Sequence, residues 1–170
     1  MDNASPISND HPPLADVPDA RSATPALTKL TFGQRVACGL LAIACAAPLV
    51  AAALVVPDSR GHGTHTQFGW PECGVAVATG YPCPTCGMTT AFAHAAQGDL
   101  VAGFVSQPLG LLLALGSAAM MWVALHSALT GSRAVPLAAR LLQPGPMWAL
   151  AGLAVAAWGY KVLTWPGLDQ

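Results

Sequence analysis

The sequence predicts an all-α membrane protein with about three transmembrane helices and a short interfacial or re-entrant helix that follows a cysteine-containing loop. Two observations lead to this fold class. Only 9% of the 170 residues are charged and 54% are apolar, whereas about a quarter of the residues in soluble domains are charged. The apolar residues are concentrated in three long stretches without any charge. Such stretches are typical of helices that cross a bilayer.

The first uncharged stretch defines the first predicted span. It covers residues 36–57, which are 22 positions between Arg35 and Asp58. A helix of this length reaches roughly 33 Å, about the thickness of the hydrocarbon core of a bilayer. Cys38 and Cys45 within it are seven residues apart. They are too distant to bond to each other, and we interpret them as packing residues.

The second and third spans are predicted over about residues 106–129 and 147–164. The second lies in a stretch from Leu100 to Ser132 that contains no charge. We expect the third to begin after the prolines at 144–146, because proline lacks the N–H donor that a helix interior requires. The aromatic residues near its ends suit the interface between lipid and water. Lys161 could reach the head groups from there.

The first 28 residues are rich in Pro, Ala, Ser and Asp. They hold too little apolar surface to offset the entropy of ordering. We therefore expect 1–28 to be a disordered cytoplasmic tail and 29–170 to be a single membrane domain, with the cysteine loop and the short helix over 58–98. Cleavage near residues 51–53 is the alternative, and it would leave two spans.

The basic residues favour one orientation in the membrane. A cytoplasmic N-terminus places five of the seven Lys and Arg residues inside and leaves Arg60 and Lys161 outside, as the positive-inside rule favours. We expect a multi-pass protein of the inner (plasma) membrane with its cysteine loop outside, although the opposite orientation stays open. The expected partners are the lipid bilayer and either a second copy of the chain or another membrane protein. Nucleic acid is not expected, because the basic residues are scattered and the net charge is −1.

One pattern is written twice in the loop, as WPECG at 70–74 and CPTCG at 83–87. The first copy has Trp where the leading Cys should stand, so Cys73, Cys83 and Cys86 are three candidate metal ligands. Zinc is the expected ion, because it prefers thiolates in a tetrahedron and two cysteines two residues apart can approach one ion from a tight turn. The fourth position is open to His94, His62, His65 or water.

Two other interpretations of the cysteines stay open. Cysteines at the start of a helix can form a reactive thiolate, and outside the cytoplasm they tend to form a disulfide. The loop could also be a compact cap in which the cysteines pack as small apolar groups. No catalytic residue is predicted, because the sequence offers no defensible nucleophile triad, phosphate loop or metalloprotease motif. An accessory role is therefore favoured over an enzyme, with a membrane thiol–disulfide oxidoreductase and a small transporter subunit as alternatives.

The loop motif continues into a predicted short helix. After Gly87, apolar residues recur at helical spacing, and Gly98 is a natural stop. Asp99 can then cap the next helix by accepting hydrogen bonds from its first N–H groups. The predicted helix is too short to cross a bilayer, so we place it at the membrane interface or packed between the spans.

The order of the motifs resembles a bacterial membrane-protein family known as domain of unknown function 2752. The likeness covers about residues 70–115 and follows the family pattern of an upstream Cys, TG, CPxCGxTRA, GD and NP. It is carried by Cys73, Thr79, Gly80, Cys83, Pro84, Cys86, Gly87, Thr89, Gly98, Asp99, Pro108 and Leu109. Thr90 stands where the family commonly has Arg, and Gln107 where it commonly has Asn. The resemblance implies a small helical membrane protein with a cysteine loop, and it implies no reaction.

Overall fold

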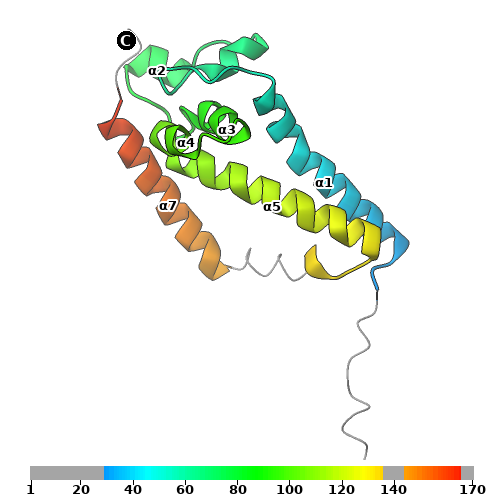
Figure 1. Ribbon diagram of the computed structural model, residues 1–170. Helices are drawn as coiled ribbons and strands as arrows, with labels where there is room; N and C mark the ends of the chain where they lie inside the picture. Colours follow the sequence, from blue (N-terminus) through cyan, green and yellow to red (C-terminus); the bar gives the residue numbers. More distant parts are fainter. Residues whose placement is uncertain (1–28, 136–143, 166–170) are drawn as a thin grey trace, which may run out of the picture.

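The structure, a computed structural model, describes residues 29–135 and 144–165 (Figure 1). Across these two ranges the regular elements are helices and no strand occurs, which confirms the all-α prediction. The tail predicted at 1–28 lies outside the described residues.

The longest helices are α1 (Phe32–Ala53) and α5 (Pro108–Thr130), which pack side by side (Figure 1). Both are long and apolar enough to cross a membrane. The third helix, α7 (Pro144–Leu163), contains a shorter apolar stretch, Met147–Leu163. The structure therefore confirms two candidate spans, and the predicted third span is not clearly one of them.

The α1 helix begins four residues before the predicted span and also ends four residues earlier. It begins early because Thr31 and Gln34 form a capping box, in which each side chain bonds to the other residue's backbone N–H, at 3.4 and 2.9 Å. Arg35 does not interrupt the helix, because its guanidinium donates to Ala128 O and Leu129 O at 2.8 and 2.6 Å. The helix ends at Ala53, and Val56, which precedes Pro57, is biased toward an extended conformation, so the helix does not reach the end of the predicted span.

The α5 and α7 helices both begin at a proline. The start of α5 at Pro108 and its end before Gly131 agree with the predicted 106–129 to within two residues. The α7 helix starts at Pro144, three residues earlier than expected. Prolines 144 and 146 both fall in its first turn, where the backbone N–H groups have no helical partner, so they do not delay the helix.

Four short helices gather at one end of the α1–α5 pair (Figure 1). They are η2 (Thr64–Phe68), α2 (Gly74–Thr79), α3 (Met88–Ala96) and α4 (Leu100–Ser106). The predicted short helix corresponds to α3. Asp99 caps the next helix as predicted, with its Oδ1 2.9 Å from Ala102 N, but that helix is the separate α4 and not the start of the second span. The first part of the connection between α1 and α3 contains η2, whose Thr64 is fully buried and bonded to Thr90 at 2.8 Å between hydroxyl oxygens.

Glycines allow α3 to pack closely against α4 and α5. A Cβ added at Gly110 of α5 would lie 2.9 Å from Ala91 Cβ, and one added at Gly103 of α4 would lie 3.3 Å from Ala91 O. Ala91 and Ala93 are fully buried in this contact region. Because α3 is fixed in this way, the turn that carries Cys83 and Cys86 is fixed where it joins the N-terminus of α3.

Candidate metal centre

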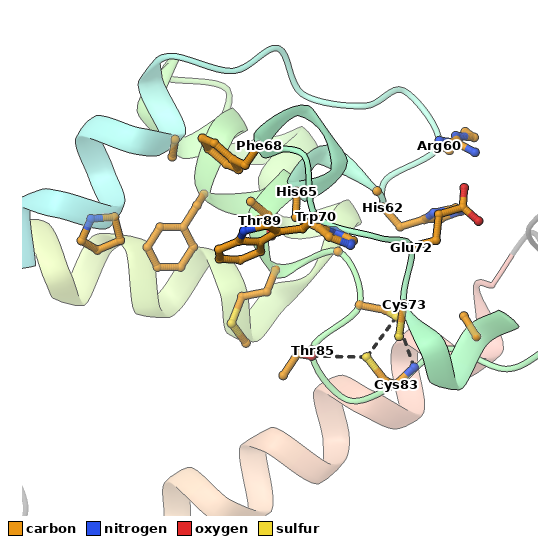
Figure 2. A pocket seen from close by; sticks show the side chains of 18 of the residues that line it. Arg60, His62, His65, Phe68, Trp70, Glu72, Cys73, Cys83, Thr85 and Thr89 are labelled. Carbon is orange, nitrogen blue, oxygen red and sulfur yellow. Dashed lines mark hydrogen bonds between the residues drawn. The ribbon is translucent and has the colours of Figure 1, made fainter. Parts of the chain in front are cut away.

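The three predicted cysteine ligands lie together. Cys73 is the residue that precedes α2, and Cys83 and Cys86 lie in the turn that leads into α3. All three Sγ atoms are within 4.8 Å of one another, and those of Cys83 and Cys86 are 3.1 Å apart. In Figure 2 the Cys73 and Cys83 side chains point toward each other. The structure thus joins the CPTCG motif with the single cysteine of WPECG.

The CPTCG turn has the geometry of a metal-binding knuckle. Cys86 N donates to Cys83 O at 3.0 Å, and Cys83 N lies 3.2 Å from Cys86 Sγ. The chain then reverses at Gly87, which has a φ of +85°. A Cβ at this position would lie 2.6 Å from Gly61 O and 2.9 Å from Ser106 O. Only glycine fits here, both for its left-handed conformation and for the space that is available.

The environments of Cys83 and Cys86 separate their acidities. Burial opposes ionisation of Cys83, but hydrogen bonds from Thr85, Cys86 and Cys73 outweigh it and lower the pKa of this thiol to about 7. The Thr85 hydroxyl lies 3.2 Å from Cys83 Sγ. Burial, followed by the hydrogen bonds with Cys83 and Cys73, raises the pKa of Cys86 above its ordinary value. Near pH 7 the Cys83 thiol is therefore about half ionised, and the thiolate is the form that binds metals.

The sulfur separations fit one tetrahedral ion better than they fit a disulfide. A disulfide requires about 2.05 Å between sulfurs, and all five cysteines of the chain are free thiols. Zinc–sulfur bonds of about 2.3 Å in a tetrahedron place sulfurs about 3.8 Å apart. The 3.1 Å between Cys83 and Cys86 and the upper bound of 4.8 Å for the cluster lie on either side of that value. The spacing of the three thiols is therefore compatible with one bound ion.

The candidate histidines are not part of the cysteine cluster. His62 stacks against Trp165 with ring centroids 4.5 Å apart, and His65 Nε2 lies 3.1 Å from Pro71 O. Both line the same cavity as the cysteines. His94 instead has its Nδ1 3.9 Å from Asp99 Oδ2 and lines a separate hollow. A histidine as the fourth ligand therefore stays a prediction.

A cavity of about 580 Å³ adjoins the cluster (Figure 2). All three cysteines line it, and its other walls include Phe68, Trp70 and three residues of α1. The α1 residues are Pro48, Ala51 and Ala52. An ion held by the three sulfurs would therefore have a neighbouring space for a fourth ligand from outside the cluster.

Other motif positions support the turn. Gln107, fully buried, donates from Nε2 to Pro84 O at 3.1 Å, and Pro108 then begins α5. Thr89 lines the cavity. Thr90, which stands at the position where arginine was expected from the family pattern, is fully buried and bonds to Thr64. The two departures from the family pattern thus occupy buried, hydrogen-bonded positions.

The sequence did not predict that residues at the end of α7 and just beyond it contact this site. Lys161, expected at the head groups, is only 3% exposed and donates to Gly61 O and Ser106 O at 3.0 Å each. Trp158 and Trp165, expected at the lipid interface, donate from Nε1 to Pro82 O and Gly80 O at 3.1 Å each. No local signal separates these roles, because aromatic and Lys residues at a helix end are equally typical of an interfacial belt.

Comparison with known proteins locates the centre within a recognised segment. Residues 73–121 match the model of a family described as Protein of unknown function (DUF2752). This segment is similar to that family. The DUF2752 segment contains the three cysteines and all of α2, α3 and α4. No curated protein and no solved structure matches the chain. The family description assigns no activity, so the argument for function rests on the geometry of the centre.

Proposed function

We propose that this protein is a membrane-embedded accessory protein whose Cys73–Cys83–Cys86 centre binds one zinc ion. The observation that carries this proposal is the convergence of three thiols, all within 4.8 Å, from two separate chain segments. Thiolate ligands favour zinc and other soft ions over magnesium or calcium. The ion would connect the start of α2 to the turn before α3, so the shape of the loop would depend on the metal.

The exposure of the long helices supports the membrane setting. Only 17% of the most apolar window of α1, and likewise of α5, is buried inside the structure. A core helix of a soluble protein would be mostly buried, whereas lipid can cover exposed apolar side chains. We place α7 as a third span, since its 17-residue stretch Met147–Leu163 reaches the lower limit for crossing a bilayer. The proposed location is the inner membrane, with the N-terminus cytoplasmic and the cysteine loop outside.

The proposed accessory role rests on the surface around the centre. Trp70, three residues before Cys73, and Tyr81, two residues before Cys83, are 66% and 65% exposed. Large exposed aromatic side chains are enriched where proteins contact each other, because they offer much contact area at low entropic cost. The partner in this proposal is another membrane protein or a second copy of the chain.

The test is to measure bound metal and free thiols in one sample of the full chain, purified in mild detergent without chelator. We expect about one zinc per chain, as a single cluster of this kind holds one ion. Cys83→Ser with Cys86→Ser should abolish it. Cys38→Ser with Cys45→Ser, in α1, is the matched control and should retain it. A wild-type chain without metal, or zinc retained after loss of Cys83 and Cys86, would contradict the proposal.

A thiol–disulfide oxidoreductase is the second candidate function. The observation that favours it is the pairing of Cys83, whose pKa is lowered to about 7, with Cys86, whose pKa is raised. A low-pKa nucleophile beside a second thiol is the arrangement that disulfide exchange requires. The same sample distinguishes the two functions. Two missing thiols without metal, together with mixed disulfides trapped on Cys83 in a Cys86→Ser variant, would support exchange over zinc binding.

A further inference from the structure

Lys161 is a buried cation that has no carboxylate partner among the residues the structure describes. Its Nζ donates to two backbone carbonyls and lies 5.6 Å from the centre of the Trp165 ring. Within the ranges the structure describes, Lys161 forms no ion pair with an Asp or Glu side chain. Carbonyl oxygens satisfy its N–H groups but leave its charge uncompensated. A buried charge is costly unless an opposite charge lies nearby, so the location of Lys161 calls for an anion.

The ammonium lies against the turn that carries the proposed zinc ligands. A Cβ added to Gly87, the residue after Cys86, would lie 3.2 Å from Lys161 Nζ. The two carbonyls that accept from Lys161 are also the ones closest to this glycine. The absence of a side chain at Gly87 is what allows the cation to approach the cysteines.

The charge of the proposed zinc centre is equal in size and opposite in sign to that of the lysine. A zinc ion carries +2 and three thiolates carry −3, so the centre has a net charge of −1. We propose that Lys161 is the counter-charge of this three-thiolate centre and that it couples zinc binding to the docking of α7. The inference rests on the zinc-binding function proposed above. It adds a residue outside the matched DUF2752 segment to the centre.

The contacts of α7 and the residues that follow it explain the coupling. Trp158 and Lys161 are three residues apart and so share one face of the helix, and Trp165 follows shortly after its end. Their three side chains all donate to the cysteine loop or to the carbonyls around Gly87. By contrast, α7 packs only sparsely against α5. The C-terminal part of α7 is therefore held by the turn that would close around the ion.

The first test compares zinc affinity in variants of the full chain by competition with a chromophoric chelator. We expect Lys161→Met to weaken zinc binding by about 10- to 100-fold, the usual effect of losing a partner just outside the ligand sphere. Lys161→Arg, which keeps the charge, should recover most of the affinity. Lys29→Met is the matched control, because Lys29 is exposed beside the start of α1, and it should bind zinc as the wild type does. Wild-type affinity in Lys161→Met would overturn the inference alone, whereas a wild-type chain that binds no zinc would overturn the proposed function as well.

A second measurement separates a charge effect from loss of the two hydrogen bonds. Lys161→Gln keeps N–H donors but removes the charge, so it also serves if Lys161→Met fails to fold. The Tm of each variant is measured with zinc and after treatment with a chelator. We expect zinc to raise the Tm of Lys161→Gln less than it raises that of the wild type. An equal drop in Tm with and without zinc would show that Lys161 is only structural and would overturn the inference.

Discussion

The α1–α5 helix pair and the opposite end of the molecule are built in different ways. We call that end the cysteine end, made up of η2, α2, α3, their connecting turns and the last turn of α7. The helix pair is joined by apolar packing along its length, with polar contacts where Arg35 and Leu30 meet the end of α5. The cysteine end is held by side chains that donate to the backbone of distant segments, such as Lys161 to Gly61, 100 positions apart. The helix pair needs only length and apolarity, whereas the cysteine end needs particular residues, so specific chemistry is expected there.

Gly87 and Gly98 provide the strongest test of this specificity. Both have left-handed backbones, with φ of +85° and +84°. A side chain at Gly87 would meet two backbone oxygens, at 2.6 and 2.9 Å, whereas one at Gly98 would meet nothing within 4 Å. Gly87→Ala should therefore reduce stability by about 3 kcal/mol or more, from strain and overpacking together. Gly98→Ala should cost about 1 kcal/mol, from backbone strain alone.

Denaturant unfolding of both variants in the same detergent would measure this difference. If Gly87→Ala and Gly98→Ala lowered the free energy of unfolding by similar amounts, the turn at Gly87 would be able to accommodate a side chain. The cysteine end would then be no more specific than an ordinary loop, and the comparison with the helix pair would fail. We also expect Gly87→Ala to lose zinc, because the substitution displaces the residue next to Cys86.

Gly110 and Gly116 extend the comparison to a single helix, α5. A Cβ at Gly110 would lie 2.9 Å from Ala91 Cβ and 3.2 Å from Met88 Cα, whereas Gly116 has nothing within 4 Å. Gly110→Ala should cost about 2 kcal/mol, because α3 has to move away. Gly116→Ala should range from neutral to about 1 kcal/mol stabilising, since alanine favours the helix. Thermal unfolding of the two variants measures the effect. If Gly116→Ala lost as much stability as Gly110→Ala, the packing of α5 against α3 would not be more specific than the rest of the helix.

The sequence predicted the helix pair well because length and missing charges are local signals. The start of α1 differs from the start of the predicted span because of the Thr31–Gln34 capping box, which is an equally local signal that the apolar pattern does not contain. The cysteine cluster was also predictable, because the spacing of CPTCG limits where its thiols can point.

The role of Lys161 could not be predicted from the sequence. The partners of Lys161 come from Gly61 and Ser106, which only the folded chain brings to α7. The position of His94 could not be predicted either, because its contact with Asp99 depends on how the chain turns between α3 and α4. Local patterns identified the candidate ligands, and tertiary contacts decided which of them meet.

The smallest expected effect concerns the protonation of Cys83 in the metal-free protein. Its pKa is lowered from 9.0 to about 7, so the folded state favours the thiolate. The resulting stabilisation is complete above pH 9, where the unfolded thiol also ionises, and it is lost as the pH falls through 7. Because Cys83 is partly exposed, solvent screens this contribution and the stability change is small. The rate of alkylation reports the thiolate directly.

Alkylation of Cys83 should therefore rise with a midpoint near pH 7, and that of Cys86 only at much higher pH, because burial and its neighbours raise its pKa. Thr85→Val removes the hydroxyl 3.2 Å from Cys83 Sγ and should move the Cys83 midpoint upward. Thr89→Val, on the wall of the same cavity, is the control and should leave it in place. A Cys83 midpoint near 9 in the wild type would show that the turn does not stabilise a thiolate. The cysteine end would then need the metal itself to ionise its first ligand, and zinc binding between pH 7 and 9 would release more protons per chain than the structure implies.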